Sequence, residues 1–284
     1  RGNTPAILYW GSRLSDVTNF EMLSLLSTSQ ELPAFPQEQA PIALSPEGAA
    51  GFEGSPGIQV HHDGYQWGIF SQIESVSVES IGVTFVSSCS GSEIQIVHCI
   101  KLDSDTDVLS ATTKITNAGT SRLWLERCDA PCIPIPMHYT KILGFNGRWG
   151  NEFQLQSLNR FKGAYLRENR SGRTSHSSFP GVIVHTEHAN ESLGDAYGLH
   201  LGWSGNHHVR VEELSSGRSY AQLGELFLPG EMQLEPGESY TSPILYGVSS
   251  QSGLSTMSAS FHRFIRAHLT RKKISTKKRP IHFN

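Results

Sequence analysis

Residues Ser121-Arg-Leu-Trp-Leu-Glu-Arg127 carry the clearest pattern in this chain of 284 residues. Leu123 and Leu125 fall on one face of an extended backbone, and Trp124 and Glu126 fall on the other. Alternation with a period of two is typical of a β-strand that has one buried face and one solvent face. This stretch therefore predicts a strand of an antiparallel sheet.

Segments of the same kind lie on both sides of this stretch. They are short, rich in β-branched residues and separated by turn pairs such as Asn146-Gly147 and Pro229-Gly230. The strand candidates are 81–86, 93–98, 108–116, 182–184, 196–201, 209–211 and 240–248. Many short strands without intervening helices indicate a mainly β protein, a large antiparallel β-sandwich that we place at residues 1–250.

The early part of the chain has a different pattern. Residues 6–10 form an apolar strand candidate that Gly11 closes. Residues 20–66 contain many Pro and Gly, which predicts a long loop with some helix near its start.

The last part of the chain predicts a helix and then a boundary. Apolar residues recur at offsets of three, four and seven within 251–270, which indicates one amphipathic helix that Ser252 or Ser255 can cap. Residues 271–284 read as a basic linker and an apolar strand that has nothing after it to pair with. We therefore expect this chain to be the front part of a longer protein.

Composition narrows the classes of function. A net charge of −3 argues against a nucleic-acid partner, and no apolar run reaches the roughly 20 residues needed to span a membrane. The four cysteines, Cys89, Cys99, Cys128 and Cys132, are too few for the dense disulfide framework of a small secreted domain. We interpret them as buried free thiols, which favours a reducing, cytoplasmic location.

No self-sufficient catalytic or metal-binding motif is present. The neighbours His61-His62 and His207-His208 would face opposite ways on a strand, and His185-Thr-Glu-His188 follows a strand instead of lying on a helix. Ser204 lies in a turn but lacks the G-x-S-x-G frame, and Ser175 beside His176 is a sequence neighbour only. We predict no catalytic residue, no metal and no cofactor.

Three tryptophans near loops are the remaining candidates. The face of an indole ring can stack on a sugar ring. Strands flank Trp149 and Trp203, which favours a core position for both. Trp67 ends a loop rich in Gly and His, so core packing and sugar contact are equally good interpretations there.

Several motifs follow one another in a fixed order along nearly the whole chain. They are Leu8-Tyr-Trp-Gly11, Gly147-Arg-Trp-Gly-Asn-Glu152, Ser171-Gly-Arg-Thr-Ser-His176 with Pro180, Tyr197-Gly-Leu-His-Leu-Gly-Trp-Ser-Gly-Asn206, Leu234-Glu-Pro-Gly-Glu238 with Pro243, and Met257 to His262 with Arg266-Ala-His-Leu269. In this order and spacing the chain resembles the N-terminal β-sandwich domain of bacterial and fungal α-galactosidases of glycoside hydrolase family 36.

The resemblance implies a supersandwich of the galactose-mutarotase-like type, followed by a (β/α)8 barrel whose first strand begins within Arg279-Pro-Ile-His-Phe-Asn284. In that family two barrel aspartates perform retaining hydrolysis of α-galactosides. Both would lie beyond residue 284. The resemblance thus implies an inactive domain that braces the barrel of the same chain, shapes its substrate pocket and takes part in homo-oligomer contacts.

A loop early in the family's domain is acidic and aromatic, and it helps to close the sugar site, sometimes across a subunit boundary. The corresponding stretch here, residues 54–64, reads differently, so its sugar contacts do not carry over residue by residue. A polar, aromatic, Gly-flanked loop nonetheless follows in that part of the chain. We therefore take Asp63 and Trp67 as the substrate-binding candidates.

Two other functions stay open at this point. One is a carbohydrate-binding module that holds sugar without cleaving it. The other is a free-standing aldose-epimerase-like sandwich with a His/Glu pair in a sheet cleft. The natural substrate, the oligomeric state and the barrel acids are not determined by the sequence.

Overall fold

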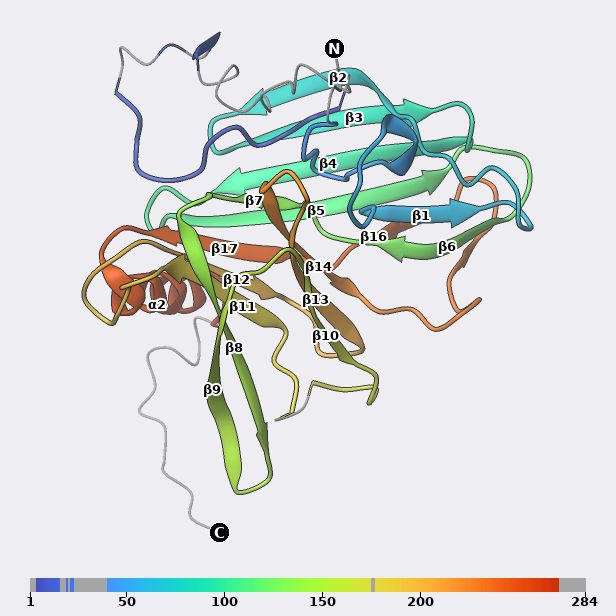
Figure 1. The fold of residues 1–284 in the computed structure, drawn as a ribbon. Helices are drawn as coiled ribbons and strands as arrows, with labels where there is room; N and C mark the ends of the chain where they lie inside the picture. Colours follow the sequence, from blue (N-terminus) through green and yellow to red (C-terminus); the bar gives the residue numbers. More distant parts are fainter. Residues whose placement is uncertain (1–3, 16–18, 20, 23–39, 175–176, 271–284) are drawn as a thin grey trace.

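The computed structural model describes residues 4–15, 19, 21–22, 40–174 and 177–270. Their fold is built on one large sheet, two small sheets and one helix (Figure 1). The pairs that join the named strands are antiparallel. The predicted mainly β, antiparallel fold class is confirmed. The predicted linker and barrel strand at 271–284 lie outside the described residues.

The large sheet has ten strands, in the order β2-β3-β4-β5-β17-β12-β11-β8-β9, with β16 added beside β5. Its strands are β2 (Gln72–Glu79), β3 (Gly82–Cys89), β4 (Ile94–Leu102), β5 (Val108–Asn117), β8 (Tyr139–Arg148), β9 (Asn151–Asn159), β11 (Gly181–Thr186), β12 (Ala196–Leu201), β16 (Ser239–Thr241) and β17 (Leu245–Ser250). The outer strand β2 is exposed along almost its whole length, and Val78 is 79% exposed.

Two small sheets lie along one face of the large sheet. The first contains β7 (Ile133–Ile135), β10 (Gly163–Asn169), β13 (His207–Glu213) and β14 (Ser219–Glu225); the second contains β1 (Ile58–His61), β6 (Leu123–Cys128) and β15 (Gln233–Leu234). In β5, Ala111 belongs to the core under the first sheet and Ile115 to the core under the second. The two residues are four positions apart, an even offset along the strand, so both cores lie on the same face of the large sheet.

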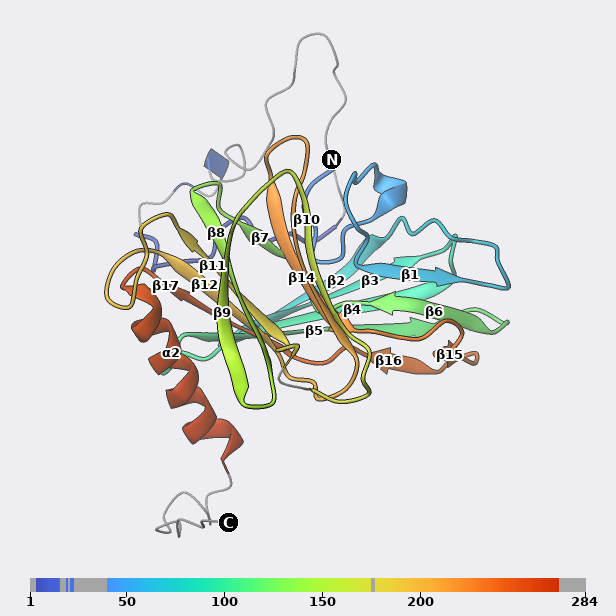
Figure 2. The ribbon, with the colours of Figure 1, turned by 60° about the horizontal axis from the view of Figure 1, so that its bottom comes forward.

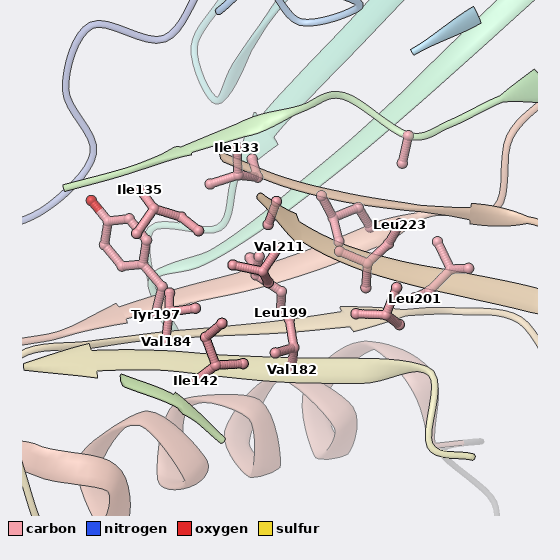
Figure 3. Packing of buried hydrophobic residues seen from close by; sticks show 14 of the residues in the cluster. Ile133, Ile135, Ile142, Val182, Val184, Tyr197, Leu199, Leu201, Val211 and Leu223 are labelled. Atoms are coloured by element: carbon pink, nitrogen blue, oxygen red, sulfur yellow. The ribbon is translucent and has the colours of Figure 1, made fainter. Parts of the chain in front are cut away.

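The main core lies between the large sheet and the four-stranded sheet. Figure 3 shows Ile133 of β7 and Leu223 of β14 opposite Val182 of β11 and Leu199 of β12. The second core repeats this arrangement with aliphatic residues of β1, β4 and β6. The alternation predicted at 121–127 is confirmed there, because Leu123 and Leu125 are buried in β6 while Trp124 is half-buried.

The C-terminal helix α2 (Gly253–Phe264) covers part of the opposite face of the large sheet and continues as a π-helical turn, η2 (Ile265–Leu269). The capping differs from expectation, because Ser252 makes no side-chain cap. Backbone carbonyls of Gly194, Asn190 and Glu191 instead accept from the first three N–H groups of the helix. Gly253 has a φ of +79°, and a Cβ there would lie 2.6–2.7 Å from that loop's backbone.

Three local predictions need correction. Residues 6–10 form no strand; Ala6 makes only an isolated bridge to Ala43. The loop predicted over 20–66 contains strand β1 and the short 3-10 helix η1 (Gly48–Ala50). The single strand predicted over 240–248 is two strands, β16 and β17, because Pro243 between them lacks an N–H for the ladder.

Candidate functional site

The predicted residues Asp63 and Trp67 lie on the loop that follows β1. His62 and Tyr65 exchange two backbone hydrogen bonds of 2.9 Å across a tight turn. The two residues between them, Asp63 and Gly64, have φ values of +48° and +87°. An Asp-Gly pair suits this turn because both residues tolerate positive φ better than most.

His62 fixes the turn to the body of the protein. Its side chain is buried, with Nδ1 2.8 Å from the carbonyl oxygen of Arg122 and Nε2 3.2 Å from that of Ser92. His61 points to the other side of the strand, as the alternation of an extended backbone predicts. The hydrogen-bonded interpretation of this histidine pair is therefore confirmed for His62.

The loop assembles what we call the aromatic loop cluster: His61, Asp63, Tyr65, Trp67 and Trp124. The His61 ring lies 4.7 Å from the Trp67 ring and 6.0 Å from the Trp124 ring, between centroids. Trp124 donates its indole N–H to Asp63 Oδ1 at 2.9 Å. Asp63 and Trp67 thus belong to one cluster, and His61 and Trp124, which the sequence did not single out, complete it.

The cluster can offer ring faces to a ligand, because Trp67 is 60% exposed and Tyr65 is exposed beside it. Its polar groups are largely used within the cluster. The Trp67 indole donates to the carbonyl oxygen of Gly64 at 2.7 Å, and Glu126 lies 3.5 Å from the His61 ring. This arrangement suits stacking on an apolar ring face.

The motif segments near residues 150, 170 and 205 meet at another part of the molecule. The backbone N–H of Gly172 donates to Asn206 Oδ1 at 2.8 Å, and that of Thr174 donates to the carbonyl oxygen of Ser204 at 2.6 Å. Arg167 joins them to the β8–β9 hairpin through Asn146 Oδ1 at 3.4 Å. Ser204 therefore has a structural contact, and Ser175 and His176 lie outside the described residues.

The core positions predicted for Trp149 and Trp203 are wrong. Trp149 is 87% exposed at the tip of the β8–β9 hairpin, which projects from the body of the molecule (Figure 1), and Trp203 is 38% exposed. Strands do flank Trp149, but they form a hairpin arm whose tip lies outside the packed layers of the sandwich. Phe153 and Leu155 of β9 are exposed as well, so the arm presents an apolar surface.

The described residues contain no group of three or more His, Cys, Asp or Glu side chains arranged to hold a metal ion. Nor does any helix among them have the length and apolarity to cross a membrane. All four cysteines carry free thiols, and three of them, Cys89, Cys128 and Cys132, are buried as expected.

Comparison with known proteins places this arrangement in a class, the sandwich domains attached to glycoside hydrolases. The family model of the glycosyl hydrolase family 36 N-terminal domain matches residues 3–235, and the chain belongs to this family. An α-galactosidase of Escherichia coli is 32% identical over 283 residues, which cover 98% of this chain and 39% of that protein. The α-galactosidase AgaA of Geobacillus stearothermophilus is 28% identical over 178 residues, 63% of this chain and 24% of AgaA.

Solved structures show the same fold. The galactosidase domain of the α-galactosidase–sucrose kinase AgaSK superposes with a TM-score of 0.86 at 19% identity, over 96% of this chain and 41% of that one. An AgaA variant in complex with 1-deoxygalactonojirimycin gives 0.84 at 21% identity, over 96% and 41%. The chain thus spans about two fifths of the length of these structures.

Proposed function

We propose that this chain is the non-catalytic N-terminal domain of a retaining α-galactosidase that hydrolyses terminal α-galactosides. The observation that carries the proposal is the family match over residues 3–235, joined to a relative named as an α-galactosidase that aligns with 98% of the chain and is more than twice as long. The catalytic acids would belong to a barrel domain of the same chain.

The first role of the domain is to brace that barrel. Helix α2 and turn η2 lead the described chain out of the sandwich (Figure 2), and Ile265 and Leu269 of η2 are exposed. The hairpin arm adds Trp149, Phe153 and Leu155 as exposed apolar side chains. A protein surface with this many exposed large apolar side chains is typical of a docking surface.

The second role is to shape the substrate pocket through the aromatic loop cluster. This cluster lies at the end of the molecule opposite α2 in both Figure 1 and Figure 2. A barrel placed directly after α2 would lie far from the loop of its own chain, and in our proposal the loop therefore completes the pocket of another subunit of a homo-oligomer. Trp67 would stack on the apolar face of the sugar and Asp63 would accept a hydroxyl hydrogen bond.

A reducing, cytoplasmic location is the third part of this proposal. The four free thiols support it, because extracellular proteins commonly pair their cysteines.

Replacement of the two loop residues in the whole enzyme tests the substrate role. The double variant Asp63→Ala, Trp67→Ala should raise the KM for raffinose several-fold and leave kcat within about twofold, because lost ground-state binding appears in KM. The matched control is Trp203→Ala, which removes another exposed indole that belongs neither to the aromatic loop cluster nor to the hairpin arm, and it should leave KM unchanged. Unchanged kinetics in the loop variant would reject the role of Asp63 and Trp67.

The non-catalytic assignment has its own test. The 284-residue chain without a barrel should not hydrolyse p-nitrophenyl α-galactoside, whereas the whole enzyme should. Hydrolysis by the shorter chain would show that an active site lies within these 284 residues, and would reject the non-catalytic assignment.

A further inference from the structure

A cavity of about 440 Å³ lies away from the aromatic loop cluster, at the edge of the main core. Segments far apart in the sequence form it. Its lining comes from residues 6–11, 41–42, 134–139, 218–219 and the side chains of Asp195, Tyr197, Ser249 and Gln251. A volume of this size is typical of pockets that bind small molecules. We call it the Asp195 cavity.

Aromatic rings form one wall of the Asp195 cavity. The Trp10 and Tyr197 rings lie 4.3 Å apart between centroids, and the Tyr139 and Tyr197 rings lie 4.9 Å apart. Tyr197 belongs to the main core and lies at its edge in Figure 3. Its hydroxyl donates to the carbonyl oxygen of Trp10. Packing against the core therefore holds this wall in place.

Polar groups converge on the same space. Asp195 Oδ2 lies 3.6 Å from His138 Nε2, and the Asp195 carboxylate remains partly exposed to the cavity. Burial, with smaller contributions from the charges of Asp195 and Tyr9, raises the pKa of Tyr139, so its hydroxyl keeps its proton and can donate. The cavity thus has a carboxylate acceptor beside hydroxyl donors.

The buried hydroxyl of Ser219 makes no hydrogen bond within the described part of the fold. Ser219, at the start of β14, lines the cavity and is only 2% exposed, and its Oγ has no hydrogen-bond partner among the described residues. A buried polar group without a partner costs free energy, commonly about 1–3 kcal/mol. The Oγ is closed off from water in this structure, so a ligand hydroxyl in the cavity would become its partner after the Ser219 side chain rotates toward the ligand.

Charge selects between two classes of ligand. Aromatic rings around a carboxylate are typical of sites for organic cations. Here, however, the guanidinium of Arg218 also lines the cavity, held by a hydrogen bond of 2.8 Å from Nη1 to the carbonyl oxygen of Ala40. A fixed positive charge disfavours a second cation nearby. A neutral ligand that both donates and accepts hydrogen bonds suits this mixture of groups better.

We propose that the Asp195 cavity binds a neutral, hydroxyl-rich ring of the pyranose class. Asp195 accepts hydrogen bonds from ring hydroxyls, Ser219 and Tyr139 bond to others, and Trp10 and Tyr9 offer ring faces. This site is separate from the aromatic loop cluster, and its existence does not depend on the function proposed above.

Binding to the 284-residue chain tests the proposal. Methyl α-D-galactopyranoside, methyl α-D-glucopyranoside and tetramethylammonium chloride are titrated separately, with saturation-transfer NMR as the readout. At least one pyranoside should bind with a Kd of about 1 mM, as expected for a small neutral ligand held by a few hydrogen bonds. Binding of the ammonium ion in place of either sugar would overturn the assignment, and so would no binding at all.

Two variants locate the site. Asp195→Asn should weaken pyranoside binding about tenfold, the equivalent of one hydrogen bond to a charged group. Ser219→Ala removes a hydroxyl that has no partner in the part of the chain that the structure describes, so it should weaken binding several-fold without lowering the midpoint of thermal unfolding. Undiminished binding in both variants would place the sugar elsewhere and reject the proposal.

Asp105→Asn is the control, because this exposed carboxylate belongs to neither the cavity nor the aromatic loop cluster, and it should leave pyranoside binding unchanged. Equal weakening in this control and in Asp195→Asn would show that the loss does not come from the cavity, and would reject the proposal. The loop's role in catalysis is read from the KM of the whole enzyme, so either proposal can fail without the other.

Discussion

The aromatic loop cluster and the Asp195 cavity both place aromatic rings beside a carboxylate, but they differ in how their polar groups are used. In the loop, Asp63 accepts from Trp124, and Trp67 donates to a carbonyl of its own turn. In the cavity, none of the described residues is a hydrogen-bond partner of the Ser219 hydroxyl. The loop therefore offers ring faces, and the cavity offers hydrogen bonds.

The two regions also differ in how deeply their aromatic side chains are buried. Trp67 stands on the surface, whereas Tyr197 is 3% exposed and packs into the main core. A loop whose side chains contribute little to the stability of the fold is suited to contact another domain or another subunit. A cavity walled by core residues is rigid, and its shape depends on the stability of the sandwich.

Stability measurements give the largest expected difference between the two regions. Tyr197→Ala should lower the free energy of unfolding by about 3–5 kcal/mol, because it leaves a hole beside the main core, whereas Trp67→Ala should cost less than about 1 kcal/mol. Urea denaturation of both variants checks this. Tyr197→Phe keeps the ring and should lose only about 1 kcal/mol with its hydrogen bond to Trp10. Equal losses for Tyr197→Ala and Trp67→Ala would remove the distinction.

The burial of His98 predicts a smaller effect on the stability of the fold, and this effect depends on pH. His98 of β4 is buried, and desolvation lowers its pKa from 6.5 to about 4. The unfolded chain therefore binds more protons than the folded chain between these values, so stability falls as the pH falls through this range. From pH 7 to pH 5 the contribution of His98 should fall by about 2 kcal/mol.

His98→Gln removes this titration and can keep a hydrogen bond to Ser45, whose Oγ lies 2.8 Å from His98 Nε2. Urea denaturation at pH 7 and pH 5 measures the difference between the two proteins. An identical loss of stability in both would show that His98 is not the responsible group.

The smallest expected effect on stability comes from the hydrogen bond that orders the aromatic loop cluster. Asp63→Ala removes the acceptor of the Trp124 indole and should cost about 1 kcal/mol, the net value of one exposed hydrogen bond at most. Asp63→Asn keeps an amide oxygen in the same place and should cost less. Thermal unfolding with tryptophan fluorescence measures both, and equal midpoints for the two variants would mean that this bond does not order the loop.

The sequence predicted those parts of the fold that depend on local pattern. Alternation located β6 and its buried leucines, and the apolar spacing located α2. Pro243 was visible in the sequence, but its effect on the strand predicted over 240–248 was not recognised, although the missing N–H gives a sufficient reason.

The candidate sites were less predictable because they depend on contacts across the fold. Asp63 and Trp67 are four residues apart and could be found together, whereas Trp124 joins them only because β6 pairs with β1. Trp149 looked like a core residue since no local signal shows that its hairpin projects beyond the sandwich. Asp195 and Ser219 carry no motif, and only the packing of distant segments brings them to one cavity.

The unpaired edge of the outer strand β2 affects how the isolated 284-residue chain behaves in solution. Apart from its pairing with β3, no described strand lies beside it, and Val76 and Val78 are exposed there. Such an edge is a template on which a second molecule can add its own strand. Concentrated samples will therefore tend to self-associate slowly, and dilute, freshly prepared samples will give the cleaner titrations.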